Sequence, residues 1–195
     1  MSRNRLVAVI LLGIGAVLFF NKSLRDRVLP AGTVSQDDQL DSDLIVTPGA
    51  IVGRPQVEIV TNKGVLVLEL RPDIAPKTVV NYLDKWNAGF CSGKTFHRVE
   101  DWVVQGCDPA GDGTGGNSTL PTETSTESFT AGSLGVARKM TPKEFSNDSQ
   151  FFIVKKDSPV LDGEYTYFGR VISGMDVVNR LTADDTIVST SLLGK

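Results

Sequence analysis

Histidine and cysteine are scarce in this chain: its 195 residues include one histidine, His97, and two cysteines, Cys91 and Cys107. A metal site built from several imidazoles or thiolates is therefore excluded, since the two cysteines also lack the spacing of metal ligands. A nucleophile activated by histidine would have to use His97, and no nucleophile-elbow motif supports one. We expect both cysteines to be free, partly buried thiols, with one disulfide as the alternative in an oxidising compartment.

An excess of positive charge is also lacking. Twenty Lys and Arg residues stand against 23 Asp and Glu residues, and no basic run occurs outside the N-terminal segment. This balance argues against a nucleic-acid partner held through phosphate contacts. The glycine-rich stretch 111–116 lacks the Gly-Lys-Ser/Thr ending of a phosphate loop. We therefore expect neither a metal ion nor an organic cofactor.

One long hydrophobic run is present, at residues 6–20, with basic residues on both sides. As a helix it rises only about 22 Å, short of a hydrocarbon core of about 30 Å, but the flanking cations can snorkel. No Ala-x-Ala cleavage site follows. We predict that residues 1–29 form an uncleaved signal anchor, with cleavage and secretion as the alternative. The flanking charges nearly balance, so an extracytoplasmic domain, in a periplasm or lumen, is a preference only.

The next segment, residues 30–55, is polar and acidic and contains several Pro and Gly residues. Such a composition buries too little apolar area to order itself, which predicts a flexible linker. The folded domain is then predicted to span residues 56–195. It begins with a hairpin formed by residues 57–61 and 65–70 around the turn Asn62-Lys63-Gly64.

The rest of the domain is predicted to be mainly β. One amphipathic helix follows Pro76, and a short helical turn is expected at residues 176–181. Further strand patterns are found at residues 95–107, 133–138, 150–155, 165–172 and 186–193. The Ser/Thr/Glu-rich stretch 118–130 is predicted to be a loop. Many short antiparallel strands with few helices indicate a closed β-barrel capped by helices.

The most informative stretch is the hairpin at residues 95–107, where period-2 alternation stands on both sides of a polar turn. If the two arms pair, four side chains could border one site: Phe96, Arg98, Trp102 and Gln105. An arginine and a glutamine among aromatic residues suggest polar groups in an apolar cleft. An ordinary hairpin with a solvated Arg98 is the alternative.

Three blocks of this chain, in order, resemble the cyclophilin-type peptidyl-prolyl isomerases. They are Phe96-His97-Arg98 with Trp102-Val103-Val104-Gln105-Gly106, then Ser149-Gln150-Phe151-Phe152-Ile153, then Leu161-Asp162-Gly163 with Phe168-Gly169-Arg170-Val171. The resemblance covers roughly residues 57–181. It implies a barrel of eight strands and an enzyme, membrane-anchored here and of bacterial type, that acts on proline-containing client polypeptides. It also implies that the glycine-rich loop borders the substrate groove, and we expect a monomer.

The same resemblance implies roles for individual residues. Arg98 corresponds to the catalytic donor, and Gln105 and Gln150 correspond to the groups that hold the substrate backbone. Trp102, Val103, Phe152 and Leu161 correspond to the proline pocket, and Ala137 and Arg138 to the strand along which the peptide runs. Alternation places His97 on the opposite face from Arg98, which suggests a core or supporting histidine.

Several positions depart from the family pattern. The turn after Arg98, Glu100-Asp101, is one residue shorter than usual, and Trp102 stands where Phe is common. At the rim, Val160 replaces a Trp associated with cyclosporin binding, Arg138 replaces Asn, and Tyr165 replaces His. These changes leave a second reading open, a non-catalytic peptide-binding or chaperone module on the same fold. A structural subunit of a membrane assembly is a third reading.

Overall fold

The computed structural model describes residues 51 and 53–194. The predicted signal anchor and nearly all of the predicted linker lie outside these residues and remain predictions. In the part of the chain that is described, no helix combines the length and the apolar character needed to cross a membrane.

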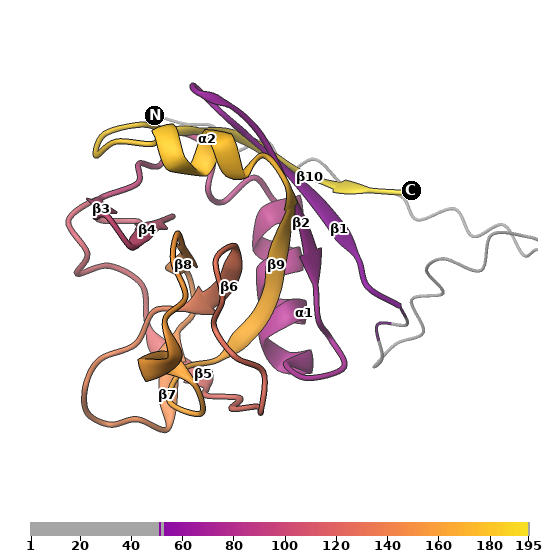
Figure 1. Ribbon diagram of the computed structural model, residues 1–195, viewed down its shortest axis with the longest axis vertical. Coiled ribbons are helices and arrows are strands. Elements are labelled where there is room, and N and C mark those ends of the chain that lie inside the picture. Colours follow the sequence, from indigo (N-terminus) through magenta and orange to yellow (C-terminus); the bar gives the residue numbers. More distant parts are fainter. Residues whose placement is uncertain (1–50, 52, 195) are drawn as a thin grey trace, which may run out of the picture. The chain divides into compact units, whose positions relative to one another are not determined.

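Eight antiparallel strands form one curled sheet (Figure 1). In spatial order they are β10 (Ile187–Leu193), β1 (Gln56–Thr61), β2 (Gly64–Leu70), β9 (Tyr167–Ser173), β6 (Ser133–Val136), β8 (Phe151–Val154), β4 (Val103–Gly106) and β3 (Arg98–Val99). The predicted mainly-β fold is confirmed, but the prediction of a closed barrel is wrong. Among the described residues, β3 and β10 are the edges of this sheet, and one isolated bridge between Thr95 and Thr186 lies beside them. Because β3 is only two residues long, it offers β10 no ladder with which to close.

Helix α1 (Pro76–Asn87) covers the main core of the domain. Its buried face presents Tyr82 and Trp86, whose rings lie 4.8 and 6.2 Å from the ring of Phe168 on β9. The Tyr82 hydroxyl donates a hydrogen bond of 2.8 Å to the backbone oxygen of Gln150. Pro76 begins the helix because its fixed φ suits a first turn that has no hydrogen bond to lose. The helix therefore ties the sheet interior to the second residue of the block 149–153.

Two small elements pack at the margins of the sheet. Helix α2 (Met175–Arg180) lies against the β1–β2 turn, where Gly64 has a φ of +138° and a Cβ would come 2.9 Å from Val177. Strands β5 (Ser118–Pro121) and β7 (Phe145–Asn147) form a separate two-stranded sheet. The prediction that residues 118–130 are only a loop is thus wrong at its beginning, because β5 finds its partner far along the chain.

The two cysteines are joined. Cys91 and Cys107 form a disulfide with a Cα–Cα distance of 5.0 Å, and both are fully buried. The prediction of free thiols is therefore wrong. The bond links the loop after α1 to the residue that directly follows β4.

Strands β4 and β8 divide their side chains between two apolar clusters. Val104 pairs with Ile153, and both lie in the main core, while Val103 pairs with Val154 in a smaller cluster. The smaller cluster also holds Phe129, Phe152, Leu161 and Tyr167. Because successive side chains of a strand point to opposite faces, these two strands carry the core on one face and the smaller cluster on the other.

Candidate functional site

A cavity of about 390 Å³ opens on the face of the smaller cluster. It is lined by residues from β3, β4, β8, the 3-10 helix η1 (Pro159–Leu161) and five connecting segments. The lining residues are His97, Arg98, Trp102, Val103, Gln105, Asp112, Gly113, Ala137, Arg138, Phe152, Leu161 and Tyr165. Most of the residues chosen from the sequence are thus brought together around one hollow.

The floor of this cavity is apolar and closely packed. Val103 and Phe152 are almost fully buried, and the Phe152 ring lies 5.8 Å from that of Phe129 and 5.9 Å from that of Tyr165. Gly135 on β6 makes room for this ring, since a Cβ there would lie 2.1 Å from Phe152 Cζ. A floor of this kind can accept the pyrrolidine ring of a proline and exclude water from it.

Arg98 stands at the rim of the cavity, with 42% of its side chain exposed. Its Nε donates a hydrogen bond of 2.7 Å to Glu100 Oε1, and its Cζ lies 5.3 Å from the centre of the Trp102 ring. Its Nη1 lies 3.4 Å from Gln105 Oε1, a long and weak contact. Within the described residues Nη2 has no partner, so the guanidinium retains donors for a ligand.

A chain of hydrogen bonds fixes the amides beside Arg98. Gln105 Nε2 donates to Gln150 Oε1 at 2.8 Å, and Gln150 Nε2 donates to Asp108 Oδ1 at 3.0 Å. The other carboxylate oxygen of Asp108, which is buried, accepts from the backbone N–H groups of Asp112 and Gly113. The glycine-rich loop is therefore attached to the same network as the rim of the cavity.

Arg138 lies between this cavity and a neighbouring one. Its Nε donates to the Glu164 backbone oxygen at 2.9 Å, and its Cζ lies 4.3 Å from the centre of the Tyr165 ring. The side chain is only 2% exposed, so its charge is committed to contacts inside the protein. The neighbouring cavity, of about 400 Å³, shares Gln105 and Gly113 with the first.

Three residues chosen from the sequence lie elsewhere. Phe96 is fully buried in the main core, beneath Gly106, because it packs on the interior side of β4. Val160 is 79% exposed on η1 and does not line the cavity. Gln150 lines the neighbouring cavity and reaches the first one only through Gln105.

The sequence reasoning missed other residues near the site. His97, which was expected to be a core or supporting histidine, also lines the cavity, with its ring beside Gly113. Burial lowers the pKa of His97, and the Arg98 cation lowers it further, although Asp108 opposes both effects. Phe129 supports the floor from a loop with no periodic pattern, and only its aromatic character could have marked it.

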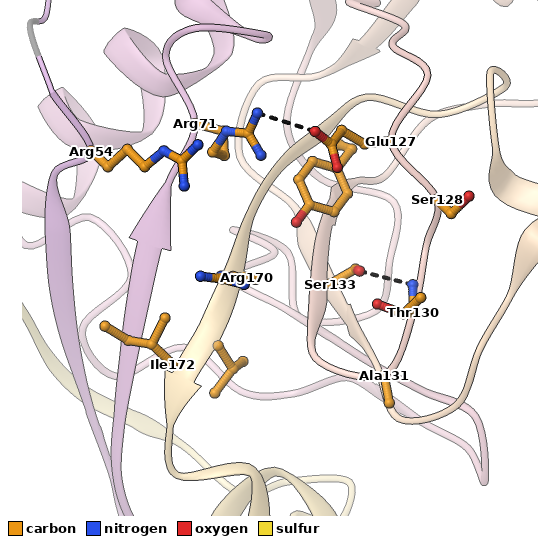
Figure 2. Close-up of a pocket in the computed structure, with 11 residues that line it drawn as sticks. Arg54, Arg71, Glu127, Ser128, Thr130, Ala131, Ser133, Arg170 and Ile172 are labelled. Carbon is orange, nitrogen blue, oxygen red and sulfur yellow. Dashed lines mark hydrogen bonds and ion pairs between the residues drawn. The ribbon is translucent and has the colours of Figure 1, made fainter.

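A larger cavity, of about 700 Å³, lies beside β9 and contains none of the predicted site residues (Figure 2). Arg54, Arg71 and Arg170 line it, but carboxylates already pair with them. Arg54 and Arg170 share Glu69 Oε1 at 3.5 and 3.2 Å, and Arg71 contacts Glu127 at 3.1 Å. Arg54 and Arg170 are about as exposed as Arg98 but lie outside the predicted site, so a substitution there can serve as a control for Arg98.

Comparison with known proteins identifies the family of the domain. Residues 56–191 match the family model described as "Cyclophilin type peptidyl-prolyl cis-trans isomerase/CLD". A probable peptidyl-prolyl cis-trans isomerase of Brucella suis is 41% identical over 132 residues, which are 60% of this chain and 66% of the relative. The chain thus covers slightly less than two thirds of that relative's length. Mouse peptidyl-prolyl cis-trans isomerase-like 1 is 37% identical over 68% of this chain and 82% of its own.

A solved structure is similar as well. The crystal structure of a Cryptosporidium parvum cyclophilin type peptidyl-prolyl cis-trans isomerase, in the presence of the dipeptide ala-pro, has a TM-score of 0.66 and 29% sequence identity. The similarity covers 72% of this chain and 99% of that one. The family model alone spans well over half of the sequence. This chain belongs to the cyclophilin-type peptidyl-prolyl cis-trans isomerase family.

Proposed function

We propose that this domain accelerates the cis–trans interconversion of X-Pro bonds in client polypeptides and so assists their folding. One observation carries the proposal: Arg98 stands with unused donors at the rim of a cavity whose floor is Val103, Phe152 and Leu161. The family to which the chain belongs supports the same reaction. No nucleophile is needed, which agrees with the single, partly buried histidine.

The chemistry requires an apolar seat and a fixed donor. The barrier to rotation, about 18–20 kcal/mol, arises from resonance that gives the C–N bond partial double-bond character. As the bond twists, the prolyl nitrogen regains its lone pair, which a donor can stabilise. A preorganised donor in a dry site contributes about 3–4 kcal/mol, or two to three powers of ten in rate. Arg98 supplies that donor, with several N–H groups in a planar fork.

The substrate is proposed to be a proline-containing segment of a flexible or unfolded chain. Val103, Phe152 and Leu161, with Trp102 at the edge, would hold the proline ring, and Gln105, supported by Gln150, would bond the peptide backbone. The peptide would run along Ala137 and Arg138, which follow β6 and line the cavity. The Ala137 carbonyl accepts a hydrogen bond from the Asn147 N–H, which holds this segment in place. The presence of ala-pro in the Cryptosporidium structure supports a proline ligand for this chain too.

A direct test measures isomerisation of an Ala-Pro test peptide by the full chain and by Arg98→Ala. We expect kcat to fall by about 10²–10³-fold, the value of one preorganised donor. Arg170→Ala is the matched control, because its exposed guanidinium lies in the separate cavity beside β9. Full activity in Arg98→Ala would refute the mechanism. Peptide binding without turnover by the parent chain would indicate a binding module instead.

We also propose that residues 1–29 anchor the protein in a membrane, with the domain on an extracytoplasmic side, as a monomer and of bacterial type. The apolar run 6–20 supports the anchor, and the Cys91–Cys107 disulfide suits an oxidising compartment. Protease treatment of intact, right-side-out vesicles tests which side the domain is on. An extracytoplasmic domain is then digested without detergent. Light scattering of the purified chain tests the monomer.

A further inference from the structure

Glu100 connects the proposed catalytic cation to the edge of the proline pocket. One carboxylate oxygen, Oε1, accepts from Arg98 Nε at 2.7 Å, and the other, Oε2, accepts from Trp102 Nε1 at 2.7 Å. The Arg98 guanidinium and the Trp102 ring also contact each other, at 5.3 Å. Three side chains thus restrain one another, and two of them line the cavity.

The carboxylate is presented by a turn that is itself fixed. The Glu100 N–H donates to the Val103 backbone oxygen at 2.8 Å, and Lys155 Nζ donates to the Glu100 backbone oxygen at 2.7 Å. The N–H of Lys155 donates to the Trp102 backbone oxygen at 2.7 Å. The short turn is therefore bound to the chain that leaves β8. The Glu100 backbone therefore keeps its place without the contact to Arg98.

Arg98 has little else to hold it. Its contact with Gln105 is 3.4 Å long, and much of the side chain is exposed to water. A long, exposed arginine samples many rotamers, and each fixed geometry has an entropic cost. Because Glu100 binds Nε, Nη2 has no partner among the described residues and Nη1 has only its long contact with Gln105, so both can turn to a substrate. The hydrogen bonds from Arg98 and from Trp102 hold the pKa of Glu100 below its usual range, so its acceptors stay charged at neutral pH.

We infer that Glu100 is a positioning residue for prolyl isomerisation, which orients both the Arg98 guanidinium and the Trp102 indole before the substrate arrives. This inference rests on the proposed role of Arg98. Glu100 touches neither the prolyl nitrogen nor the proline ring in this assignment. Its effect should therefore appear in the rate of the chemical step more than in substrate affinity.

The experiment compares kcat and KM of the full chain with those of Glu100→Ala, Glu100→Gln and Asp101→Ala. Asp101 is the matched control, since it shares the turn but pairs with Lys156, and 77% of its side chain is exposed. We expect Glu100→Ala to lose about tenfold in kcat, a modest misplacement effect, with a smaller rise in KM because the released Trp102 indole borders the proline pocket. Glu100→Gln keeps one acceptor oxygen and should recover about half of that loss on a logarithmic scale. Asp101→Ala should match the parent.

Fluorescence and the unfolding midpoint together show whether Glu100 orients the Trp102 indole or only stabilises the fold. The chain has two tryptophans, and Trp86 is buried in the main core. Release of the partly buried Trp102 indole in Glu100→Ala should therefore alter the emission and acrylamide quenching of Trp102 alone, at an unchanged unfolding midpoint.

The outcomes distinguish failure of the Glu100 inference from failure of the proposed isomerase function. An unchanged kcat in Glu100→Ala, while Arg98→Ala is inactive, would overturn this inference and leave the proposed function intact. Equal losses of activity and thermal stability in Glu100→Ala and Asp101→Ala would also overturn it, because they would indicate a turn-stabilising role. Full activity in Arg98→Ala would overturn the proposed function and this inference together.

Discussion

The Cys91–Cys107 disulfide should supply a large share of the stability of the domain. The two cysteines are 16 positions apart, and a loop of that length has its unfolded-state entropy reduced by cross-linking. The chain-entropy relation gives about 3 kcal/mol for such a loop. Replacement of both residues, Cys91→Ala with Cys107→Ala, should therefore lower the free energy of unfolding by about that amount. For a domain of this size the melting temperature should fall by roughly 10 °C.

The backbone at Cys107 allows the estimate to be refined. Its φ is +63°, a left-handed conformation that costs a residue with a Cβ about 1 kcal/mol. Glycine adopts this conformation without strain. The variant Cys91→Ala with Cys107→Gly should therefore recover part of the loss, up to about 1 kcal/mol, relative to the double alanine variant.

Urea unfolding of the parent and both variants, with and without a reductant, measures these differences. Both cysteines are fully buried, so a reductant should react with the native protein only after it opens. Equal stability of the parent and the double alanine variant would refute the reasoning. So would rapid labelling of two thiols in the native parent protein under oxidising conditions, because it would show that the bond is not formed.

Three further predictions concern the support of the cavity. Gly135→Ala should displace the Phe152 ring, because the new Cβ would lie 2.1 Å from Phe152 Cζ. Kinetics should show KM raised at least tenfold, and urea unfolding should show a free energy of unfolding lower by about 1–3 kcal/mol. An unchanged KM would contradict this prediction. Asp108→Ala should cost about 1–3 kcal/mol in urea unfolding, since two backbone N–H groups and Gln150 lose a buried acceptor; an unchanged midpoint would count against the network. Burial lowers the pKa of His97 in the folded protein, where Asp108, Asp112 and Arg98 face it. The unfolded chain therefore binds a proton at His97 more readily than the folded chain does. The free energy of unfolding should then fall as pH drops below about 6.5. His97→Gln should flatten that slope, and an identical slope in both proteins would refute the assignment.

The sequence was most informative where local pattern and spatial neighbour coincide. The Asn62-Lys63-Gly64 turn and the strands on either side of it could be predicted because hairpin partners are adjacent in the chain. The same holds for Arg98 and Gln105, which pair directly across β3 and β4. Resemblance then added the residues of β8 and η1, which no local pattern connects to this hairpin.

Features that depend on distant packing were missed. Alternation alone could not determine which face of the hairpin turns inward. Phe96 was predicted to border the cavity, but it lies in the main core. The pairing of the cysteines depends on where the loop after α1 meets the end of β4, a contact that no motif encodes. The sheet stays open between its edge strands β3 and β10 because β3 is short. The length of a strand is hard to predict, since strand ends are the least certain part of a pattern.

Strands β4 and β8 show why stability and function can be altered separately in this domain. Phe151 and Ile153 face the main core, whereas Phe152 and Val154 face the smaller cluster. A change at Phe151 therefore removes packing against Tyr82 and Trp86 of α1, and a change at Ile153 removes main-core packing, without touching the cavity directly. A change at Phe152 alters the cavity floor and leaves the aromatic contacts of Tyr82 and Trp86 in place. Because one strand carries both sets of residues in alternation, a one-residue shift of its register would exchange core and site, so the main core must fix the register on which the site depends.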